Sequence, residues 1–264
     1  MLPILELRSK SGRSTARVSS FGARLIDWTF EGQPHLFMPQ AGAADEVVAP
    51  HGGVPVLFPQ FGLFGPGRKH GVVRDRDWRV EEQGESFCLL RTRLRGEDGD
   101  FDVFLRVDLH DDGPDLSFSA VNVGTQAQSF TAGLHTYLRV PNIETTLLEG
   151  LEAVAYEDAL QNLTPVEPAW VPLTAPVNVD RVYVATPRRL QLRTPDFALL
   201  LEQSGFHDTV VWNPGPEIAT TFADLNDGEW RTFLCVEAAQ IRPPVTLGPM
   251  DTWYGTQKIR RLAA

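Results

Sequence analysis

The sequence predicts an all-β protein, a large antiparallel β-sandwich with few short helices. Three observations support this prediction. Apolar and polar residues alternate with a period of two along several stretches, and turn-forming residues separate these stretches. The third observation is that no segment shows three full turns of helical periodicity. Many short strands joined by turns are typical of a β-sandwich.

The clearest alternation covers residues 101–109, where every odd position is apolar and most even positions are polar. Shorter alternating stretches at 116–120 and 190–193 predict two more strands. Clusters of Gly, Asp, Asn and Pro predict hairpin turns, at residues 96–100, 111–114 and 226–229. The best helix candidate is short, at residues 154–163.

Residues 1–264 are expected to form a single domain, because no shift in composition marks a boundary and no repeat is found. The segment 164–176 carries four prolines and is interpreted as an extended surface connection that packs over the sheet.

The formal net charge of −10 argues against a nucleic-acid or anionic-membrane partner, since either would need a broad basic face. No apolar run reaches the length of a membrane span, and the first ten residues do not resemble a signal peptide. Cys88 and Cys235 are far apart in the sequence, so we expect two buried free thiols in a reducing cytoplasm. We also expect a monomer.

Residues 51–78 form a segment rich in glycine and proline, which excludes a helix. It predicts a short strand at 54–58 followed by a rigid loop that presents His70. Between positions 51 and 79, five Lys or Arg residues face two Asp residues, a local balance of +3 that includes Arg68, Lys69 and Arg74. A stiff, basic and aromatic-rich loop indicates a site for a polar, anionic small molecule.

Three further polar residues lie within apolar strand sequence: His135, Asp180 and Glu237. A buried carboxylate is costly unless paired, and burial raises its pKa toward the range of a general base. Taken singly, each residue is more often structural than catalytic. No two histidines have the spacing of metal ligands, so we expect no metal site.

The segments 52–62 (GGVPVLFPQFG) and 70–74 (HGVVR) resemble the glucose-6-phosphate 1-epimerase branch of the aldose 1-epimerase family. Later segments follow in the order of that family. They are LHTYLRV at 134–140, VDRVY at 179–183, VWNP at 211–214, CVE at 235–237, and residues 243–255. The resemblance covers residues 20–260 and implies the galactose-mutarotase-like sandwich fold.

The resemblance implies interconversion of the α and β anomers of an aldohexose by ring opening, without metal or organic cofactor. Glu237 would be the general base at the C1 hydroxyl, and His135 the general acid at the ring oxygen. His70 would steady the ring oxygen, and Asp180 would hold sugar hydroxyls. The other candidate substrate contacts are His51, Phe58, Gln60, Phe61, Arg68, Lys69, Arg74 and Trp212, with Phe58, Phe61 and Trp212 as apolar walls. Among them, Arg68 and Lys69 stand where the family commonly has uncharged residues.

Two positions depart from the family pattern. His51 stands where the phosphate-handling members have an arginine, and histidine cannot make arginine's bidentate phosphate contact. Arg68, Lys69 and the retained Arg74 compensate in part. Ala238 and Ala239 replace the usual Pro-Gly after the glutamate, which alters the turn beyond the proposed base.

Three functions are compatible with these residues. The leading hypothesis is a mutarotase for a sugar phosphate, or alternatively for a free aldose. A second is a sugar-binding or sensor protein without catalysis, which the intact pair His135 and Glu237 disfavours. A third is a glycosidase using Asp180 and Glu237 as paired carboxylates, which would leave the histidines unexplained.

Overall fold

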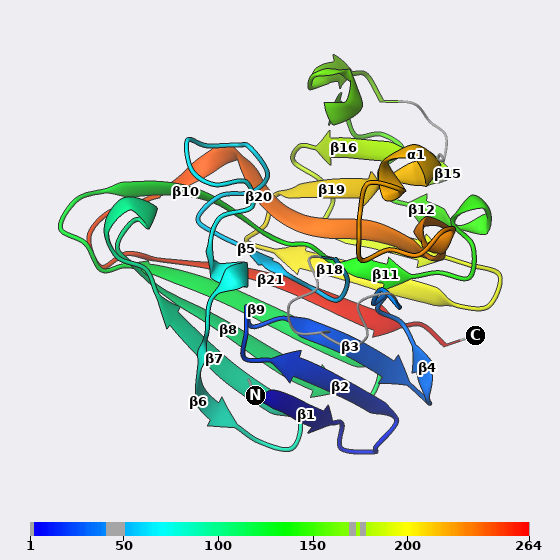
Figure 1. Ribbon diagram of the computed structural model, residues 1–264, viewed down its shortest axis with the longest axis horizontal. Helices are drawn as coiled ribbons and strands as arrows, with labels where there is room; N and C mark the ends of the chain where they lie inside the picture. Colours follow the sequence, from blue (N-terminus) through cyan, green and yellow to red (C-terminus); the bar gives the residue numbers. More distant parts are fainter. Residues whose placement is uncertain (1–2, 41–50, 169–172, 175–177, 264) are drawn as a thin grey trace.

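The computed structural model describes residues 3–40, 51–168, 173–174 and 178–263, and strands dominate this part of the chain (Figure 1). Its strands pair in antiparallel fashion within three sheets. The all-β sandwich expected from the alternation is confirmed.

The largest sheet in the described part of the chain has nine strands in the order β15-β12-β17-β18-β21-β9-β8-β7-β6. Their bounds are β6 Arg79–Gln83, β7 Phe87–Arg93, β8 Phe101–His110, β9 Gly113–Asn122, β12 Leu147–Glu149, β15 Leu173–Thr174, β17 Arg189–Arg193, β18 Ala198–Ser204 and β21 Thr252–Arg261. The strands predicted from alternation at 101–109, 116–120 and 190–193 are β8, β9 and β17.

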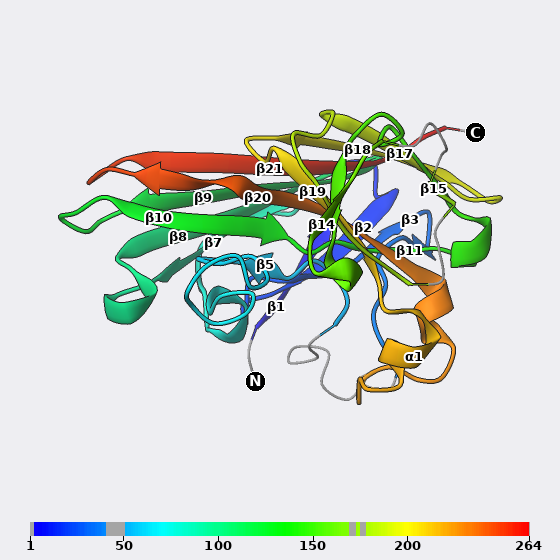
Figure 2. The ribbon, with the colours of Figure 1, turned by 90° about the horizontal axis from the view of Figure 1, so that it is seen from above.

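The second sheet has eight strands among the described residues, in the order β14-β13-β16-β19-β20-β10-β5, with β11 also paired to β20. Their bounds are β5 Val56–Leu57, β10 Gln128–Leu134, β11 Tyr137–Arg139, β13 Tyr156–Asp158, β14 Thr164–Val166, β16 Val179–Tyr183, β19 Asp208–Asn213 and β20 Phe233–Leu247. Figure 2 shows this sheet stacked against β9 and β21 of the first sheet.

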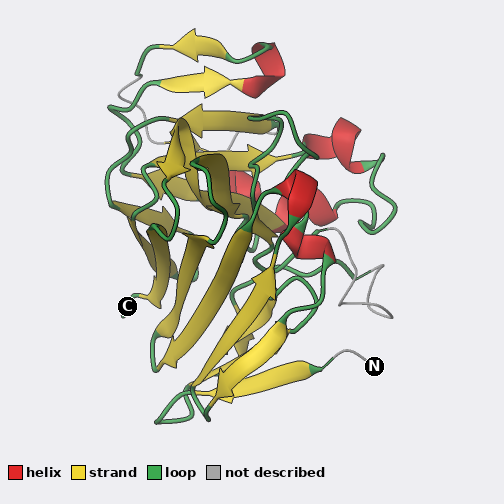
Figure 3. Cartoon of the chain, turned by 90° about the vertical axis from the view of Figure 1, so that its left-hand side faces the viewer, coloured by secondary structure: helices red, strands yellow, loops and turns green. Residues whose placement is uncertain are grey.

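A four-stranded sheet made of β1 Ile4–Arg8, β2 Ser14–Ser19, β3 Leu25–Phe30 and β4 Gln33–Pro34 lies beside them in the described part of the chain. Helical structure is short, as Figure 3 shows: α1 Gly215–Ala219 and the 3-10 turns η2 Val73–Asp75, η3 Gly96–Asp98, η4 Ile143–Thr145, η5 Ala159–Gln161 and η6 Glu229–Thr232. No helix in the described ranges is long and apolar enough to cross a membrane.

The two faces of the eight-stranded sheet have different surroundings, and the pocket lies on the face that is turned away from the large core. One face contributes side chains such as Val56, Leu134 and Val236 to the large core shared by all three sheets. The other face carries a smaller apolar cluster that includes Leu57, Val210 and the loop residue Phe61. Because side chains alternate along each strand, the strands that build the core also build a second surface outside it.

The predicted helix at 154–163 is wrong. Residues Tyr156–Asp158 form β13, which pairs with β16, and only η5 follows it. Asn162 and Leu163 then have positive φ angles, which end any helix. Hydrogen bonds to a neighbouring strand outweigh weak helix propensity here.

Three other predictions concern turns and cysteines. The segment 226–229 joins α1 to η6 instead of two strands, because the Glu229 carboxylate accepts a hydrogen bond from the Asn226 amide at 2.7 Å. Cys88 and Cys235 are buried and unbonded, as expected. The connection 164–176 contains the short strands β14 and β15, and Trp170 and Val171 lie outside the described residues.

Candidate active site

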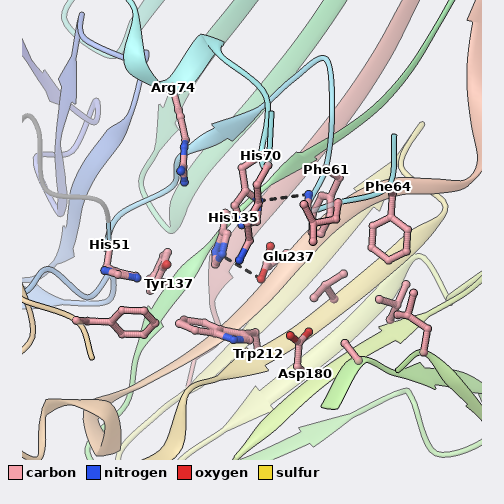
Figure 4. A pocket seen from close by; sticks show the side chains of 18 residues that line it. His51, Phe61, Phe64, His70, Arg74, His135, Tyr137, Asp180, Trp212 and Glu237 are labelled. Carbon is pink, nitrogen blue, oxygen red and sulfur yellow. Dashed lines mark hydrogen bonds and ion pairs between the residues drawn. The ribbon is translucent and has the colours of Figure 1, made fainter. Parts of the chain in front are cut away.

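A pocket of about 550 Å³ opens on the outer face of the eight-stranded sheet. Figure 4 shows its side chains converging from strands on one side and from a loop on the other. The lining residues are His51, Phe61, Gly62, Leu63, Phe64, Lys69, His70, Arg74, His135, Tyr137, Ala159, Leu163, Asp180, Val182, Val210, Trp212, Phe222 and Glu237.

Strand register places the polar floor of this pocket. Glu237 of β20 pairs with Val210 of β19, and Asp180 of β16 pairs with Trp212 of β19. Paired residues point to the same face of a sheet, as do residues two apart on one strand. Both carboxylates therefore project into the pocket together with the Trp212 ring, although 57 residues of sequence separate them.

His135 follows β10 directly and is held by a hydrogen bond from its amide to the carbonyl of Pro55 at 2.9 Å. Its ring stacks on Tyr137 with centroids 4.6 Å apart and an angle of 8° between the planes. The Trp212 ring contacts His135 edge-on at 5.8 Å. These contacts fix the plane of the imidazole.

The Nδ1 atom of His135 lies 3.4 Å from Oε1 of Glu237. This is an ion-pair distance without hydrogen-bond geometry, since Nδ1 of His135 and Oε2 of Glu237 have no hydrogen-bond partner among the described residues. Both side chains are at least nine-tenths buried. Buried polar atoms without partners at a pocket floor are suited to receive polar groups of a ligand.

The electrostatics of this pair follow from its burial. Burial, with Asp180 adding to it, raises the pKa of Glu237 well above its usual range. Burial, and then the interactions with His70, His51 and Arg74, lower the pKa of His135 well below its usual range. Both shifts disfavour charge, so burial favours a neutral imidazole beside a protonated carboxyl.

The loop that follows Phe58 carries His70 over the pocket. Its backbone folds back so that Val72 donates to the Phe58 carbonyl at 3.0 Å, and Gly71 has a φ of 69°. A Cβ on Gly71 would lie 2.1 Å from that carbonyl oxygen, so the close approach requires glycine. The Gln60 side chain bonds the backbone of Gly62 and Gly67, which closes the loop on itself.

His70 is neutral in this setting. Burial, followed by the interactions with Arg74, Lys69 and His51, lowers the pKa of His70 to about 3. Its Nδ1 accepts a hydrogen bond from the Gly62 amide at 3.3 Å, so Nε2 carries the proton. The ring faces His135 with centroids 5.7 Å apart (Figure 4).

The two ends of the pocket differ in charge. Asp180 lies at one end, near Lys69. Burial raises the pKa of Asp180 to about 6; the interaction with Lys69 lowers this pKa in part, and the interaction with Asp158 raises it further. His51 and Arg74 lie at the other end (Figure 4). The His51 ring bonds the Asp224 carboxylate at 2.8 Å and stacks parallel to Trp212 at 6.2 Å.

Most of the expected site residues meet in this pocket: His51, Phe61, Lys69, His70, Arg74, His135, Asp180, Trp212 and Glu237. Three do not line it. Phe58 is fully buried in the core against Phe101 and Phe130, so it is no wall of the pocket. Gln60 supports the loop from within, and Arg68 points to solvent, where it pairs with Asp75 at 2.6 Å.

Sequence reasoning missed Tyr137, Phe222 and Asp224. Tyr137 could have been found, because it lies two residues after His135 in a strand-like segment. Phe222, which contacts the His51 ring at 4.3 Å, and Asp224 follow α1 and carry no periodic signal.

A possible metal-binding group lies at the pocket floor, where His135, Cys235 and Glu237 each offer a ligand atom within 4.8 Å of the others. Metal ligands must be deprotonated. Burial raises the pKa of both Cys235 and Glu237, which holds their protons in place. This set fits proton transfer better than a resident metal ion.

Comparison with known proteins gives three findings. Residues 3–260 match the family description "Aldose 1-epimerase". A protein from Cenchrus ciliaris, provisionally named glucose-6-phosphate 1-epimerase, is 30% identical over 261 residues, which cover 91% of this chain and 79% of that protein. A protein from Escherichia coli with the same provisional name is 26% identical and covers 83% of this chain and 77% of its own length.

Solved structures share the fold. A provisionally named mutarotase from Salmonella typhimurium superposes with a TM-score of 0.86 at 20% identity, over 100% of this chain and 91% of that one. A provisionally named aldose 1-epimerase from Escherichia coli superposes with a TM-score of 0.84 at 16% identity, over the full length of both chains.

Proposed function

The chain belongs to the aldose 1-epimerase family, and from this premise we propose that it is a mutarotase that interconverts the α and β anomers of a hexose 6-phosphate. The observation that carries the proposal is the buried pair His135 and Glu237, whose nearest polar atoms face each other at 3.4 Å across the pocket floor. An acid and a base held this close can serve the two oxygen atoms on C1 of a single sugar ring.

Ring opening needs one proton to leave the C1 hydroxyl and another to reach the ring oxygen. Glu237 takes the first proton and His135 delivers the second, while the C1–O5 bond breaks to give the open-chain aldehyde. Rotation about C1–C2 and reclosure with the roles reversed yield the other anomer. The pair starts as carboxylate and imidazolium and ends as carboxyl and imidazole, so its proton count is unchanged.

Burial favours this direction of proton transfer. A buried ionised pair is disfavoured relative to the neutral pair, as the opposed pKa shifts of Glu237 and His135 indicate. The bound sugar stabilises the ionised pair by hydrogen bonds. Ring opening then neutralises two charges in a dry site, which lowers the barrier to the step.

The remaining pocket residues orient the sugar. The Nε2–H of His70 donates to the ring oxygen or to a neighbouring hydroxyl. Because His70 is neutral, it interferes with neither the proton that Glu237 takes nor the proton that His135 delivers. Asp180 accepts hydrogen bonds from sugar hydroxyls at the opposite end of the pocket. Phe61 and Trp212 lie against the apolar faces of the ring.

The preference for a phosphorylated sugar rests on Arg74 and His51 at one end of the pocket and on the provisional names of the curated relatives. The Nε atom of Arg74 is buried without a hydrogen-bond partner among the described residues, and it lies 3.9 Å from Asp75. A phosphate would satisfy this guanidinium. Two buried thiols that form no disulfide support our further proposal that the protein acts in the cytoplasm. We also propose that it is a monomer.

The test is saturation-transfer NMR at the anomeric protons of glucose 6-phosphate, with the wild type and Glu237→Gln side by side. We expect the wild type to accelerate anomer exchange. The rate of exchange catalysed by the variant should be lower by at least about a hundredfold, since a general base contributes a factor of about 10²–10⁴ to the rate. The thermal midpoint should not fall, because the amide replaces a carboxyl that burial already holds protonated.

Equal exchange by a folded Glu237→Gln protein would overturn the assignment of the base. Acceleration of free glucose and glucose 6-phosphate at equal rates would overturn the phosphate preference in favour of a free-aldose epimerase. If the wild type accelerated no hexose and yet bound one, the protein would be a sugar-binding protein.

A further inference from the structure

Arg24 is a buried arginine whose side chain has no partner among the described residues. Arg24 is 5% exposed, and its Nη1 atom is buried without a hydrogen bond to any of those residues. No ion pair or side-chain hydrogen bond involves this guanidinium within the described part of the chain. A buried cation that lacks a counter-ion costs free energy, so the site is incomplete as it stands.

The backbone places Arg24 near the segment that carries Arg74. The next residue, Leu25, bridges to Val54, and both side chains belong to the large core. Gly22, two residues before Arg24, packs so closely against the Arg74 segment that a Cβ on it would lie 2.4 Å from the carbonyl oxygen of Arg74. The Arg24 side chain is buried and does not line the cavity.

The groups that interact electrostatically with Arg24 lie at one end of the pocket. Burial lowers the pKa of Arg24, with Arg74 adding to this, whereas Tyr137, Asp75 and Asp224 act in the opposite direction. Neither carboxylate pairs with Arg24 in the described part of the chain: Asp75 pairs with Arg68 at 2.6 Å and lies 3.9 Å from Arg74, and Asp224 bonds His51 at 2.8 Å. Arg24 and Arg74 are therefore two guanidiniums near the same end of the pocket, and the carboxylates there already have other partners.

This end of the pocket is a better place for an anion than the opposite end. Lys69 at the opposite end has Asp180 beside it, and Asp180 would repel a phosphate whenever it is ionised. Arg74 extends from its loop toward His51 and Tyr137 (Figure 4).

Building on the proposed function, we propose that Arg24 is a positioning residue for the 6-phosphate of the substrate. It lies near Arg74 and Tyr137 and adds a second positive charge to the end of the pocket where the phosphate binds. It thereby supplies the charge that His51 does not provide at the position where the resembling enzymes carry an arginine.

The first test compares Arg24→Met and Arg24→Lys with the matched control Arg189→Met, which removes an exposed arginine paired with Glu202 on the nine-stranded sheet. For each protein, kcat and KM are measured for glucose 6-phosphate and for glucose. We expect Arg24→Met to lower the ratio of the two kcat/KM values by about tenfold or more, chiefly through KM for the phosphate. Arg24→Lys keeps the charge, so its ratio of kcat/KM values should be closer to that of the wild type. The ratio for Arg189→Met should equal that of the wild type.

The second test is thermal unfolding with inorganic phosphate at constant ionic strength. Phosphate should raise the thermal midpoint of the wild type and raise that of Arg24→Met much less, because only the complete site binds it. Without phosphate, Arg24→Met should melt higher than the wild type, since an unpaired buried charge has been removed. A purely structural arginine would give a lower midpoint and an unchanged phosphate response.

The outcomes separate this inference from the function it rests on. Suppose that the wild type isomerises glucose 6-phosphate and that Arg24→Met has the same ratio of kcat/KM values for the two sugars as the wild type. This result would overturn the role of Arg24 and leave the proposed function intact. A wild type inactive on both sugars would overturn the function, and the phosphate-dependent midpoint of the two proteins would still decide whether Arg24 serves an anion site. An equal phosphate response in both proteins overturns the inference in either case.

Discussion

Asp180 is a buried pocket residue whose ionisation lowers the stability of the folded protein. Burial raises the pKa of its carboxyl to about 6, against about 3.9 in an unfolded chain. Between these pH values the folded protein binds a proton that the unfolded chain has released. Its contribution therefore makes the protein less stable as the pH rises from about 4 to about 6, and the loss persists above that range.

Replacing Asp180 with Asn should remove this cost. Above pH 6 we expect Asp180→Asn to be more stable than the wild type by about 1–3 kcal/mol, and near pH 3.5 the difference should vanish. The same variant should lower kcat/KM about tenfold or more, because an amide is a weaker acceptor for sugar hydroxyls. Urea unfolding at the two pH values and anomer-exchange kinetics would measure both effects.

The exposed Asp196→Asn serves as the control, since Asp196 lies on the turn between β17 and β18 of the nine-stranded sheet and does not line the pocket. A stability gain of equal size at both pH values would mean that the titration of Asp180 is not its cause.

At this scale the sequence predicts some site residues and is silent on others. Asp180 and Glu237 stand out because a carboxylate within an apolar strand needs an explanation. Arg24 has no such signal, since an arginine at the start of a strand is ordinarily a solvated residue. Its importance depends on burial, on the absence of a counter-ion among the described residues, and on the position of Arg74, none of which spacing reveals.

The loop between β5 and η2 is the element that completes the pocket. It carries His70 in a left-handed conformation with a φ of 65°, and Gln60 links two of its glycines from within. Sequence composition predicted a loop that folds back and presents His70 at its end, and the structure confirms this path of the chain. The family resemblance suggested Gln60 as a contact of the sugar, whereas the Gln60 side-chain amide bonds the loop backbone.

Gln60→Leu should therefore loosen this loop without unfolding the sandwich. Three hydrogen bonds of about 1 kcal/mol each are lost locally, so the loop should open more often than the rest of the chain. We expect faster trypsin cleavage after Arg68, a side chain that is 59% exposed, and a fall of about tenfold in kcat because His70 is less well placed.

Gln33→Leu on the exposed strand β4 is the matched control and should change neither rate. Trypsin resistance equal to that of the wild type in Gln60→Leu would show that the glycine and proline backbone alone fixes the loop. A sugar-binding role for Gln60 would instead raise KM with no change in cleavage.

Elements that depend on pairing partners were harder to predict than those with a long internal pattern. Strand β8 could be predicted because its alternation runs over ten residues and matches its burial. The segment 154–163 has three residues in β13, and its structure is decided by β16, which lies more than 20 residues later in the sequence. Local propensity is too weak to predict such pairing.

Across the whole molecule, the eight-stranded sheet divides structure from function between its two faces. The alternation in the sequence predicts that each strand has two faces, and it does not say which face meets the core. Phe58 and Phe61 illustrate the ambiguity. Both belong to one motif and both were expected as pocket walls, yet Phe58 is 0% exposed in the large core and Phe61 belongs to the smaller cluster beside the pocket.

This division predicts opposite consequences for the two phenylalanines. Phe58→Ala should destabilise the fold by about 3–5 kcal/mol, because the cavity it leaves is closed in by Phe101, Phe118 and Phe130. Its KM for the sugar should match that of the wild type, since the side chain does not reach the pocket.

Phe61→Ala should cost less stability, because part of its surroundings is the open pocket, and it should raise KM severalfold by removing a wall of the binding site. Its ring also lies 6.0 Å from that of His70, so kcat should fall as well. Urea unfolding and anomer-exchange kinetics on both variants measure the contrast. If Phe58→Ala raised KM as much as Phe61→Ala does, the core and the pocket would be coupled through the sheet, and the two faces could not be treated as independent.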